Sequence, residues 1–294
     1  MKLNMEEVKR LVAGALAEDI GSGDVTSNAV VPEAAQASAH LVSRAEGVLA
    51  GLPVAQEVFA QLSPRCRFTP LLSDGAALAR GARIARVEGP ARAALAGEPV
   101  ALNFLQRLSG IATLTRRCVE AVKGREAAIL DTRKTTPLLR HLEKYAVTVG
   151  GGRNHRIGLY DQALIKDNHL QMLLPQAGGL PQAVALAVRL ARAKVAKEML
   201  VEVETENLPM VEAAIAAGAD IILLDNMTPD QMTLAAHRVR DARKQSGHRF
   251  PITEASGGIT LENLARVAAT GIDTISLGAL THSAPALDIA MDFG

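Results

Sequence analysis

Hydrophobic residues recur along the chain with two different spacings, and the pattern changes near residue 97. Before this point, apolar residues at helical spacing predict helices over 5–17 and 53–62. Short β-like segments bounded by glycine turns predict strands at 38–50, 66–72 and 83–88. The first third of the chain is therefore expected to form a small unit of helices and strands.

Beyond residue 97 the pattern predicts one long helix over 98–122 and then a regular alternation of strands and helices. Apolar strands that alternate with amphipathic helices indicate a parallel sheet. The predicted strands are 127–132, 162–167, 199–204, 220–225, 251–254 and 272–277. The predicted helices between them are 137–149, 180–197, 207–217, 229–244 and 260–270.

Polar residues cluster at the carboxyl end of each predicted strand. Six such units suit either a barrel or an open, doubly wound sheet. Polar residues at six successive strand ends favour the barrel, because a barrel brings all these ends to one mouth. The clusters are Asp131-Thr132-Arg133-Lys134, Lys166-Asp167-Asn168-His169, Glu202 and Glu204, Asp225-Asn226, Glu254-Ala255-Ser256-Gly257-Gly258, and Gly278-Ala279.

Composition narrows the classes of partner. The formal net charge is +1 and only 2% of residues are aromatic, so neither a basic field nor stacking platforms point to nucleic acid. No run approaches the ~18 apolar residues of a membrane span, and the acidic start Met1–Glu7 does not resemble a signal peptide. Cys66 and Cys118 lack metal-ligand spacing and are expected to be reduced thiols. We therefore expect a cytoplasmic protein with no membrane or nucleic-acid partner.

The predicted mouth carries both signs of charge, from separate parts of the chain. Gathering many cations is costly unless an anion offsets them, so a multiply anionic ligand is implied. The carboxylates Glu204 and Asp225 suggest a divalent cation or sugar hydroxyls. The alternative is a rim of solvated ion pairs. The cations are Arg133, Lys134, Arg140, His155, Arg156 and Lys166.

Two glycine-containing turns suggest a phosphate site. Ser256, Gly257 and Gly258 lead from a strand end into a helix, where backbone N–H groups can bind phosphate. Gly278 follows the next strand, and phosphate sites recur in the last two strand–helix loops of barrels. The alternative is that these glycines only form turns.

The remaining motifs favour metal-assisted transfer over nucleophilic hydrolysis. The segment 150–156 lacks the strand-to-helix order of a dinucleotide fingerprint, and we interpret it as a flexible loop that delivers His155 and Arg156. His155 and His169 do not have the spacing of paired metal ligands, and His169 is either a ligand or a helix cap. No Ser-His-Asp arrangement or zinc set is apparent in the sequence.

Over essentially its whole length the chain resembles the quinolinate phosphoribosyltransferases. The first motifs that carry the resemblance are Glu18-Asp19-Ile20-Gly21, Gly23-Asp24-Val25-Thr26, Leu102-Asn103-Phe104, Leu108-Ser109-Gly110-Ile111-Ala112-Thr113 and Asp131-Thr132-Arg133-Lys134-Thr135-Thr136-Pro137. They continue with Asn154-His155-Arg156, Leu164-Ile165-Lys166-Asp167-Asn168-His169, Leu223-Leu224-Asp225-Asn226 and Gly278-Ala279-Leu280-Thr281-His282-Ser283.

The resemblance implies an open parallel α/β barrel, TIM-like and of the type II phosphoribosyltransferase kind, with an N-terminal α/β sandwich. It places the sandwich at 1–112, joined by a C-terminal tail at about 279–294, and the barrel at 113–278. It also implies a homodimer, or a hexamer of dimers, with shared active sites. The implied reaction joins quinolinate to phosphoribosyl pyrophosphate with decarboxylation, in de novo NAD biosynthesis.

The resemblance also assigns roles to residues. Quinolinate would be held by Arg133, Lys134, His155, Arg156 and Lys166. Glu204 and Asp225 would meet the ribose and Mg²⁺ of the phosphoribosyl donor, and its 5′-phosphate would contact Ser256, Gly257, Gly258 and Gly278. The residues expected to take part in catalysis are Lys134, Lys166, Glu204 and Asp225.

One position departs from the family pattern. The long helix is usually preceded there by Glu-Arg, whose arginine reaches the substrate of the neighbouring subunit, whereas this chain has Glu98-Pro99. Proline is expected to fit the first turn of the predicted helix. Arg92 and Arg107 are candidate replacements for the missing cation. Pro99 leaves open a related transferase for nicotinate or another pyridine. A second alternative is a catalytically silent, ligand-binding paralogue, against which the presence of Arg133, Lys166, Glu204 and Asp225 argues.

Overall fold

The computed structural model describes residues 1–247 and 249–294. The chain forms two compact units, which we describe separately. Unit 1 comprises Met1–Arg116, Lys134–Gly152 and Leu280–Gly294, and unit 2 comprises Arg117–Arg133 and Arg153–Ala279. None of the described helices is long and apolar enough to cross a membrane.

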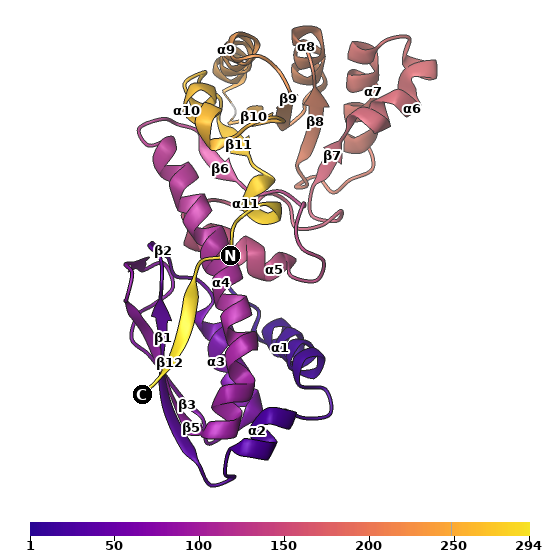
Figure 1. The fold of residues 1–294 in the computed structure, drawn as a ribbon. Coiled ribbons are helices and arrows are strands. Elements are labelled where there is room, and N and C mark those ends of the chain that lie inside the picture. Colours follow the sequence, from indigo (N-terminus) through magenta and orange to yellow (C-terminus); the bar gives the residue numbers. More distant parts are fainter. Residues whose placement is uncertain (248) are drawn as a thin grey trace. The chain divides into compact units, whose positions relative to one another are not determined.

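Unit 1 contains a four-stranded antiparallel sheet in the order β12-β1-β5-β3. Its strands are β1 (Gln36–Ser43), β3 (Arg67–Pro70), β5 (Arg83–Pro90) and β12 (Ile289–Phe293). A separate pair joins β2 (Gly47–Val48) to β4 (Ala77–Leu78). The C-terminal strand β12 runs beside β1, so the end of the chain completes the N-terminal sheet (Figure 1).

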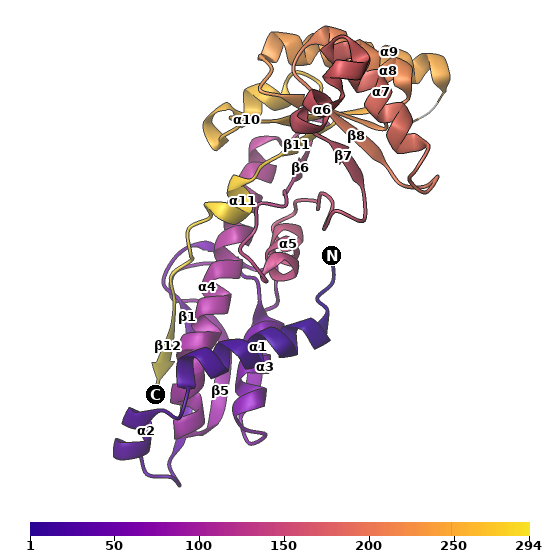
Figure 2. The same ribbon diagram turned by 90° about the vertical axis from the view of Figure 1, so that its right-hand side faces the viewer.

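The helices of unit 1 are α1 (Met5–Ile20), α2 (Val25–Val30), α3 (Leu52–Leu62), most of α4 (Ala91–Ala121), α5 (Arg140–Val149) and most of α11 (Ala279–His282). Asn4 caps α1, because its side chain accepts the amides of Glu6 and Glu7. Val8 and Val12 form part of the buried face of α1, which packs against α3. The long helix α4 and the short helix α2 are seen from the side in Figure 2.

Pro99 lies inside α4, and the prediction that it occupies the first helical turn is wrong. The helix begins at Ala91, directly after β5, so Pro99 is its ninth residue. Proline has no amide N–H and leaves the carbonyl of Leu95 without its helical donor, which typically costs ~3 kcal/mol. The side of the helix at Pro99 is exposed, whereas neighbouring Gly97 packs tightly against Phe59.

Arg107 and Glu143 form a buried ion pair between α4 and α5. The Glu143 side chain is fully buried and lies 2.7 Å from the Arg107 Nη2 atom. The same carboxylate accepts the amide and the hydroxyl of Thr136, and Arg107 also donates to the carbonyl of Ala284. Arg107 therefore links three segments of unit 1: α4, α5 and the C-terminal segment.

Unit 2 contains a six-stranded parallel sheet in the order β6-β11-β10-β9-β8-β7. Its strands are β6 (Ala128–Leu130), β7 (Ala163–Ile165), β8 (Val201–Thr205), β9 (Ile221–Asp225), β10 (Ile252–Ser256) and β11 (Thr274–Ser276). The last strand pairs with the first, and each of the others with its neighbour in sequence, as in a barrel. Because β6 and β7 are the two ends of this order, the barrel is open between them. The predicted open parallel barrel is confirmed.

The helices of unit 2 are α6 (Asp167–Ala177), α7 (Leu180–Arg192), α8 (Leu208–Ala217), α9 (Pro229–Ser246) and α10 (Leu261–Ala268). Helices α7 to α10 are arranged around the outside of the sheet (Figures 1 and 2). Buried residues such as Val184 and Val211 form part of their apolar faces. This arrangement leaves the carboxyl ends of the strands for polar residues.

Most predicted elements appear with shifted ends, and three helices, α2, α6 and α11, were missed. The strand was predicted over 162–167, but β7 stops at Ile165 and α6 begins at Asp167, within the predicted polar cluster. Helix α2 lies in a stretch that the prediction left unassigned. The predicted domain boundaries remain a prediction, and in the structure Lys134–Gly152, including α5, groups with unit 1.

We predict that Arg107→Ala strongly destabilises the protein. The substitution leaves the Glu143 carboxylate buried without its cation, a change that typically costs about 3–5 kcal/mol. The free energy of unfolding from urea titration measures this loss.

Arg44→Ala is the control, because Arg44 pairs with Asp292 where both side chains are 42–47% exposed. An exposed pair contributes less than about 1 kcal/mol. Equal losses for the two variants would contradict a special role for the buried pair.

Candidate active site

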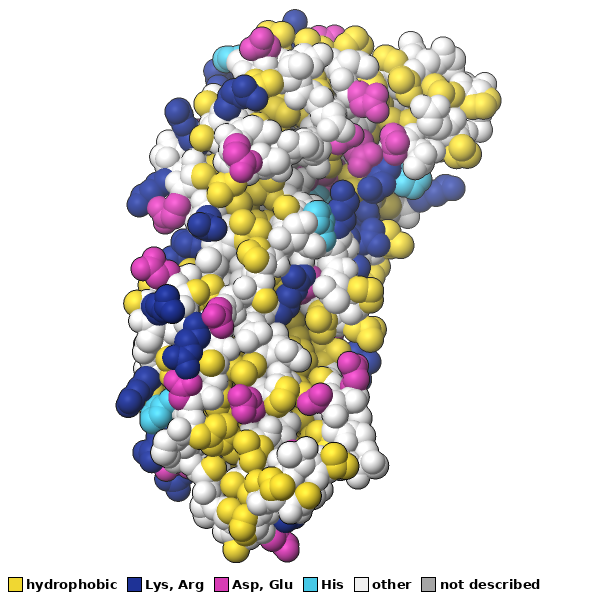
Figure 3. All heavy atoms as spheres, viewed as in Figure 1, with side chains coloured by type: hydrophobic (Ala, Val, Ile, Leu, Met, Phe, Trp, Pro, Cys, Tyr) yellow, Lys and Arg dark blue, Asp and Glu magenta, His cyan; other side chains and the backbone are white. Residues whose placement is uncertain are grey.

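The polar residues of unit 2 lie where the parallel strands end. Asp131 follows β6, Lys166 follows β7 and Glu204 lies near the end of β8. Asp225 and Ser256 end β9 and β10 and are paired in register. Parallel strands place these ends along one edge of the sheet, as predicted from the sequence. Lys and Arg side chains gather beside Asp and Glu side chains over the region of β7 and α6 (Figure 3).

The loop that carries His155 and Arg156 is attached to the end of β6. Arg153 forms a bridge to this strand, with its amide donating to the Ile129 carbonyl at 2.8 Å. The buried Asp131 carboxylate accepts the backbone amide of His155 at 2.9 Å and the side-chain amide of Asn154 at 2.6 Å. The positions of His155 and Arg156 are therefore set by backbone pairing to β6 and by a buried acid.

The glycines that precede this loop are closely packed, although the sequence suggested a flexible approach. A Cβ atom on Gly150 would lie 2.5 Å from the carbonyl of Ala112, and one on Gly152 would lie 2.8 Å from Thr115 and Val147. These glycines are required because the backbone of this turn packs closely against neighbouring atoms of unit 1.

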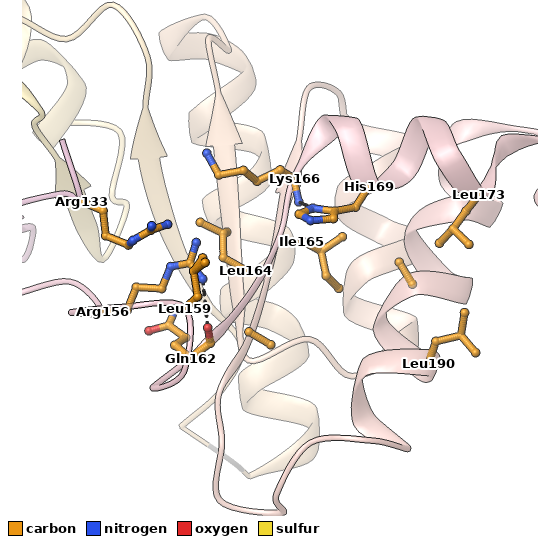
Figure 4. Close-up of a pocket in the computed structure, with 12 residues that line it drawn as sticks. Arg133, Arg156, Leu159, Gln162, Leu164, Ile165, Lys166, His169, Leu173 and Leu190 are labelled. Carbon is orange, nitrogen blue, oxygen red and sulfur yellow. Dashed lines mark hydrogen bonds between the residues drawn. The ribbon is translucent and has the colours of Figure 1, made fainter.

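A pocket of about 420 Å³ opens beside β7. One side is basic and polar and the other is apolar (Figure 4). Arg133, Arg156, Gln162, Lys166 and His169 supply the polar atoms. Leu173 and Leu190 lie on the side away from the two arginines, Leu164 and Ile165 lie between the two sides, and Leu159 lies beside Arg156 (Figure 4). A pocket of this size suits a small molecule that has both an apolar ring and negative charge.

The guanidinium groups of Arg133 and Arg156 are drawn toward each other in the pocket (Figure 4). Burial, and then the charge of Arg133, lowers the pKa of Arg156 below its usual range. Arg156 is 8% exposed, and its Nη1 donates to the carbonyl oxygen of Gln162 at 3.1 Å. Two like charges held this close favour an anionic ligand, which would offset their repulsion.

Lys166 and His169 form the upper end of the pocket in Figure 4. The backbone amide of Lys166 donates to Nδ1 of His169 at 2.8 Å, so His169 caps the first turn of α6. The ammonium group of Lys166 lies 3.7 Å from a carboxylate oxygen of Glu204. Of the two alternatives for His169, the structure therefore shows the cap.

Glu204 and Asp225 line a second, smaller cavity of about 20 Å³, together with Asp167 and Glu206. Burial, followed by the charges of Asp225 and Asp167, raises the pKa of Glu204, although the amide of Asp167 and the charge of Lys166 oppose this change. The space suffices for one water or ion. Carboxylate oxygens are the donors that Mg²⁺ prefers, so the residues present fit this ion.

The Ser256-Gly257-Gly258 turn contains two glycines in the left-handed region, with φ of +83° and +60°. A Cβ atom on Gly257 would lie 2.3 Å from the side-chain oxygen of Asn226. Only glycine allows this close approach of the turn to the end of β9. Gly278 follows β11, which pairs with β10, so both predicted phosphate-binding turns lie at neighbouring strand ends.

A third group of polar residues is buried within unit 2, and its role was not predicted. Nε2 of His155 lies 3.2 Å from a carboxylate oxygen of Glu202 and 3.4 Å from one of Glu254. His155 does not line the 420 Å³ pocket as described, although it was expected to contact quinolinate. The available signal was a charged residue inside each predicted strand, Glu202 between two valines and Glu254 before Ala255. No signal distinguished Gln162.

Lys134 and Arg140 belong to unit 1, unlike the other cations of the predicted site. The carbonyl of Lys134 accepts the hydroxyl of Thr281 at 2.7 Å. Arg140 donates through Nε to the hydroxyl of Thr135 at 3.0 Å. The predicted contact between Lys134 and substrate stays a prediction.

The fold and the pockets of unit 2 are typical of an α/β-barrel enzyme that binds a multiply anionic small molecule. Comparison with known protein families makes the assignment specific. The model of the quinolinate phosphoribosyl transferase N-terminal domain matches residues 24–109, and that of the C-terminal domain matches residues 111–292. The chain belongs to the quinolinate phosphoribosyltransferase family, as its motifs predicted.

Relatives match along nearly the whole chain. A probable nicotinate-nucleotide pyrophosphorylase (carboxylating) of Bacillus subtilis is 44% identical over 99% of this chain and 94% of its own length. The chloroplastic nicotinate-nucleotide pyrophosphorylase of Arabidopsis thaliana is 40% identical over 97% of this chain and 82% of its own length.

Solved structures agree with this assignment. The nicotinate-nucleotide pyrophosphorylase of Francisella tularensis matches with a TM-score of 0.89 and 38% identity, over 100% of this chain and 98% of that one. Human nicotinic acid phosphoribosyltransferase matches with a TM-score of 0.60 but only 14% identity, over 100% of this chain and 74% of that one. The human protein therefore shares the fold, and its likeness carries no argument about substrate.

Proposed function

We propose that the protein transfers the phosphoribosyl group of phosphoribosyl pyrophosphate to quinolinate and removes one carboxyl group as carbon dioxide. The other products are nicotinate mononucleotide and pyrophosphate. The reaction is a step in NAD biosynthesis. The observation that carries this proposal is the basic pocket with an apolar wall, in a chain that matches the family over both domains. A flat aromatic ring with two carboxylates has the shape and charge that such a pocket accepts.

The proposed quinolinate ligands are Arg133, Lys134, Arg156 and Lys166, and His155 belongs to the same assignment. Arginine binds carboxylates through paired N–H donors, and its charge-assisted hydrogen bonds are stronger than neutral ones. Arg133 and Arg156 would each hold a carboxylate, and the leucine-rich wall would contact the ring. Ser256, Gly257, Gly258 and Gly278 are proposed to bind the 5′-phosphate of the donor through backbone amides.

The chemistry requires charge stabilisation more than proton transfer. The lone pair of the pyridine nitrogen forms a bond to C1′ of the ribose, and the bond from C1′ to pyrophosphate breaks with its electron pair on oxygen. Glu204 and Asp225 would stabilise the positive charge that develops at C1′. Loss of carbon dioxide then leaves an electron pair at C2, beside the cationic ring nitrogen. This pair forms a C–H bond with a proton from solvent. Lys134 and Lys166 would lower the energy of these charged states.

Glu204 and Asp225 are also proposed to hold Mg²⁺, directly or through water. When bound, the ion would neutralise charge on the departing pyrophosphate. The proposal is supported by the four carboxylates that line the small cavity. Burial, and then the charges of Asp225 and Asp167, raise the pKa of Glu204, and a cation would offset these charges.

The protein is further proposed to act as a homodimer, or a hexamer of dimers, with active sites shared between subunits. This assembly is what the family resemblance implies. A shared site makes position 99 relevant to the neighbouring subunit, and it gives the departure at Pro99 a testable consequence.

The direct test is an assay with quinolinate, phosphoribosyl pyrophosphate and Mg²⁺. We expect one carbon dioxide for each pyrophosphate, and loss of turnover in excess chelator that added Mg²⁺ restores. Turnover of nicotinate without carbon dioxide would instead favour a related pyridine transferase. A protein that binds both ligands but forms no product would be a silent paralogue. Full turnover in chelator would contradict the metal assignment alone.

We predict that Arg133→Ala weakens quinolinate binding selectively. A charge-assisted hydrogen bond contributes about 1.5–3 kcal/mol, so the dissociation constant should rise about 10- to 150-fold. Affinity for the phosphoribosyl donor should change little. Calorimetry of both ligands measures the two effects.

Arg238→Ala is the matched control, because Arg238 is 64% exposed and pairs with Glu212 on neighbouring helices. It should leave both affinities unchanged. Equal loss of both ligands in Arg133→Ala would show that Arg133 has a structural role.

A further prediction concerns Pro99, where the proposed shared site lacks a cation. Arg92 donates to the carbonyls of Val31 and Asn28, and Arg107 is paired with Glu143, so both candidate replacements are engaged within their own unit. Pro99→Arg should therefore raise kcat/KM for quinolinate about 10- to 150-fold, which corresponds to about 1.5–3 kcal/mol. The KM of the donor should stay nearly constant.

Pro99→Ala is the control that distinguishes the effect of the added positive charge from the effect of a restored helical hydrogen bond. Both substitutions restore a helical amide that can donate to the Leu95 carbonyl, so both should raise the free energy of unfolding. Only the arginine variant should improve kcat/KM for quinolinate. No gain in Pro99→Arg, with the dimer intact by light scattering, would reject the missing-cation explanation.

A further inference from the structure

The buried group formed by His155, Glu202 and Glu254 joins three parts of unit 2. His155 lies in the loop before β7, Glu202 lies in β8 and Glu254 lies in β10. The side chains are 8%, 0% and 2% exposed. Among the residues described, this is the one set of three or more His, Cys, Asp or Glu side chains whose ligand atoms lie within 4.8 Å of one another. Burying two carboxylates is costly, so their retention requires an explanation.

The hydrogen bonds of His155 locate its proton. The backbone amide of Arg156 donates to Nδ1 at 2.7 Å, so Nδ1 presents a lone pair. The proton therefore lies on Nε2, the nitrogen that faces both carboxylates. A metal-bound imidazole has the opposite arrangement, because the ligating nitrogen is bare and the other N–H donates. This geometry favours a proton-sharing group over a metal site.

The two carboxylates hold the imidazole in place from one side. Burial disfavours a charged imidazole, but the hydrogen bonds and charges of Glu202 and Glu254 outweigh it and raise the pKa of His155. Both glutamates therefore attract the Nε2 proton and fix the orientation of the ring.

Two connections lead from Glu202 to the Arg156 guanidinium in the pocket. The first passes through Nε2 of His155, the residue next to Arg156. The second passes through Gln162. Its side-chain amide donates to Glu202, and its backbone carbonyl accepts a hydrogen bond from Nη1 of Arg156 at 3.1 Å. Gln162 and Arg156 line the pocket, and Figure 4 shows the bond between them. Glu202 thus contacts both segments that position Arg156.

We propose that Glu202 is a positioning residue that orients Arg156 for a carboxylate of the substrate, with His155 and Gln162 as the intermediaries. The identification of that carboxylate as one of quinolinate rests on the proposed function. Glu254 supports His155 only, because its contact in the group is with Nε2. The role differs from catalysis, since Glu202 is fully buried and does not line the pocket.

The test is a double-mutant cycle read by quinolinate binding. Glu202→Gln keeps the size of the side chain but removes its charge, and it should weaken quinolinate binding about tenfold while the donor KM stays constant. Arg156→Ala should weaken it at least as much. If Glu202 acts through Arg156, the double variant should bind quinolinate no more weakly than Arg156→Ala alone. Losses that add fully in the double variant would overturn the proposal.

Gln162→Met provides an independent arm in case Glu202→Gln does not fold. It removes the amide that contacts Glu202 but keeps the backbone carbonyl that accepts Arg156. Quinolinate affinity should fall in the same direction. An unchanged affinity in Gln162→Met would also overturn the proposal.

Asp220→Asn is the structural control. Asp220 precedes β9, does not line the pocket, pairs with Arg192 and accepts the amide of Val201. Its loss should lower the melting temperature without changing quinolinate affinity. A comparable loss of affinity in Asp220→Asn would show that Glu202→Gln reports only general destabilisation.

Two further outcomes keep this inference separate from the proposed function. If the wild type binds quinolinate but forms no product, the transferase assignment fails, while the binding cycle still tests Glu202. A stoichiometric metal in the wild type that is lost in Glu254→Gln would instead overturn the assignment of a proton to Nε2.

Discussion

Parallel pairing of six strands is the constraint on which the site of unit 2 depends. Each strand in such a sheet ends at the same edge, so polar residues far apart in sequence are brought together by backbone hydrogen bonds alone. The pairing of β11 with β6 curves the sheet toward a barrel, whereas β7 remains unpaired with β6. The basic pocket lies beside β7, and the small acidic cavity lies at the ends of β8 and β9. The two signs of charge thus come from neighbouring strands and meet where Lys166 lies 3.7 Å from Glu204.

Charge in unit 2 also differs with depth. Asp131, Glu202 and Glu254 are almost completely buried, while Arg133 and Lys166 reach the pocket. Each buried carboxylate contacts the loop that leads to a cation: Asp131 accepts the amide of His155, and the glutamates face its imidazole. Held in this way, Arg156, the next residue in this loop, keeps its place before an anion arrives. Such preorganisation reduces the cost of binding, because the side chains need not be ordered by the ligand.

The sequence predicted the parts of this arrangement that follow from periodicity. All six strands of the sheet and the polar residues at their ends were identified, because buried parallel strands are continuous apolar runs. Helix α6 was missed, because the end of a strand, a helix cap and a cluster of candidate ligands overlap at 166–169. The start of α4 was also misplaced, because Pro99 resembles a helix start and the helix in fact continues from β5.

Contacts between distant segments explain what the sequence did not reveal. Glu202 and Glu204 lie two residues apart on the same strand, yet one is buried beside His155 and the other borders the acidic cavity. Nothing in their spacing separates these surroundings, because the difference comes from the loop before β7 and from β10. His155 shows the same limit: the Asn-His-Arg motif indicated a ligand, and nothing in it indicated that Nε2 lies beside Glu202 and Glu254.

The proposed reaction needs no general base, and this bears on the role of the buried group formed by His155, Glu202 and Glu254. A pyridine nitrogen already has the lone pair that forms the new bond, so the proposed reaction asks the protein for fixed charges and not for a proton acceptor. His155 is accordingly held with its proton between two carboxylates, an arrangement poorly suited to accepting another proton from substrate. The same contacts suit a support for neighbouring cations, since a hydrogen-bonded and fully buried acid moves little. The group is therefore better explained by the orientation of Arg156 than by acid–base chemistry.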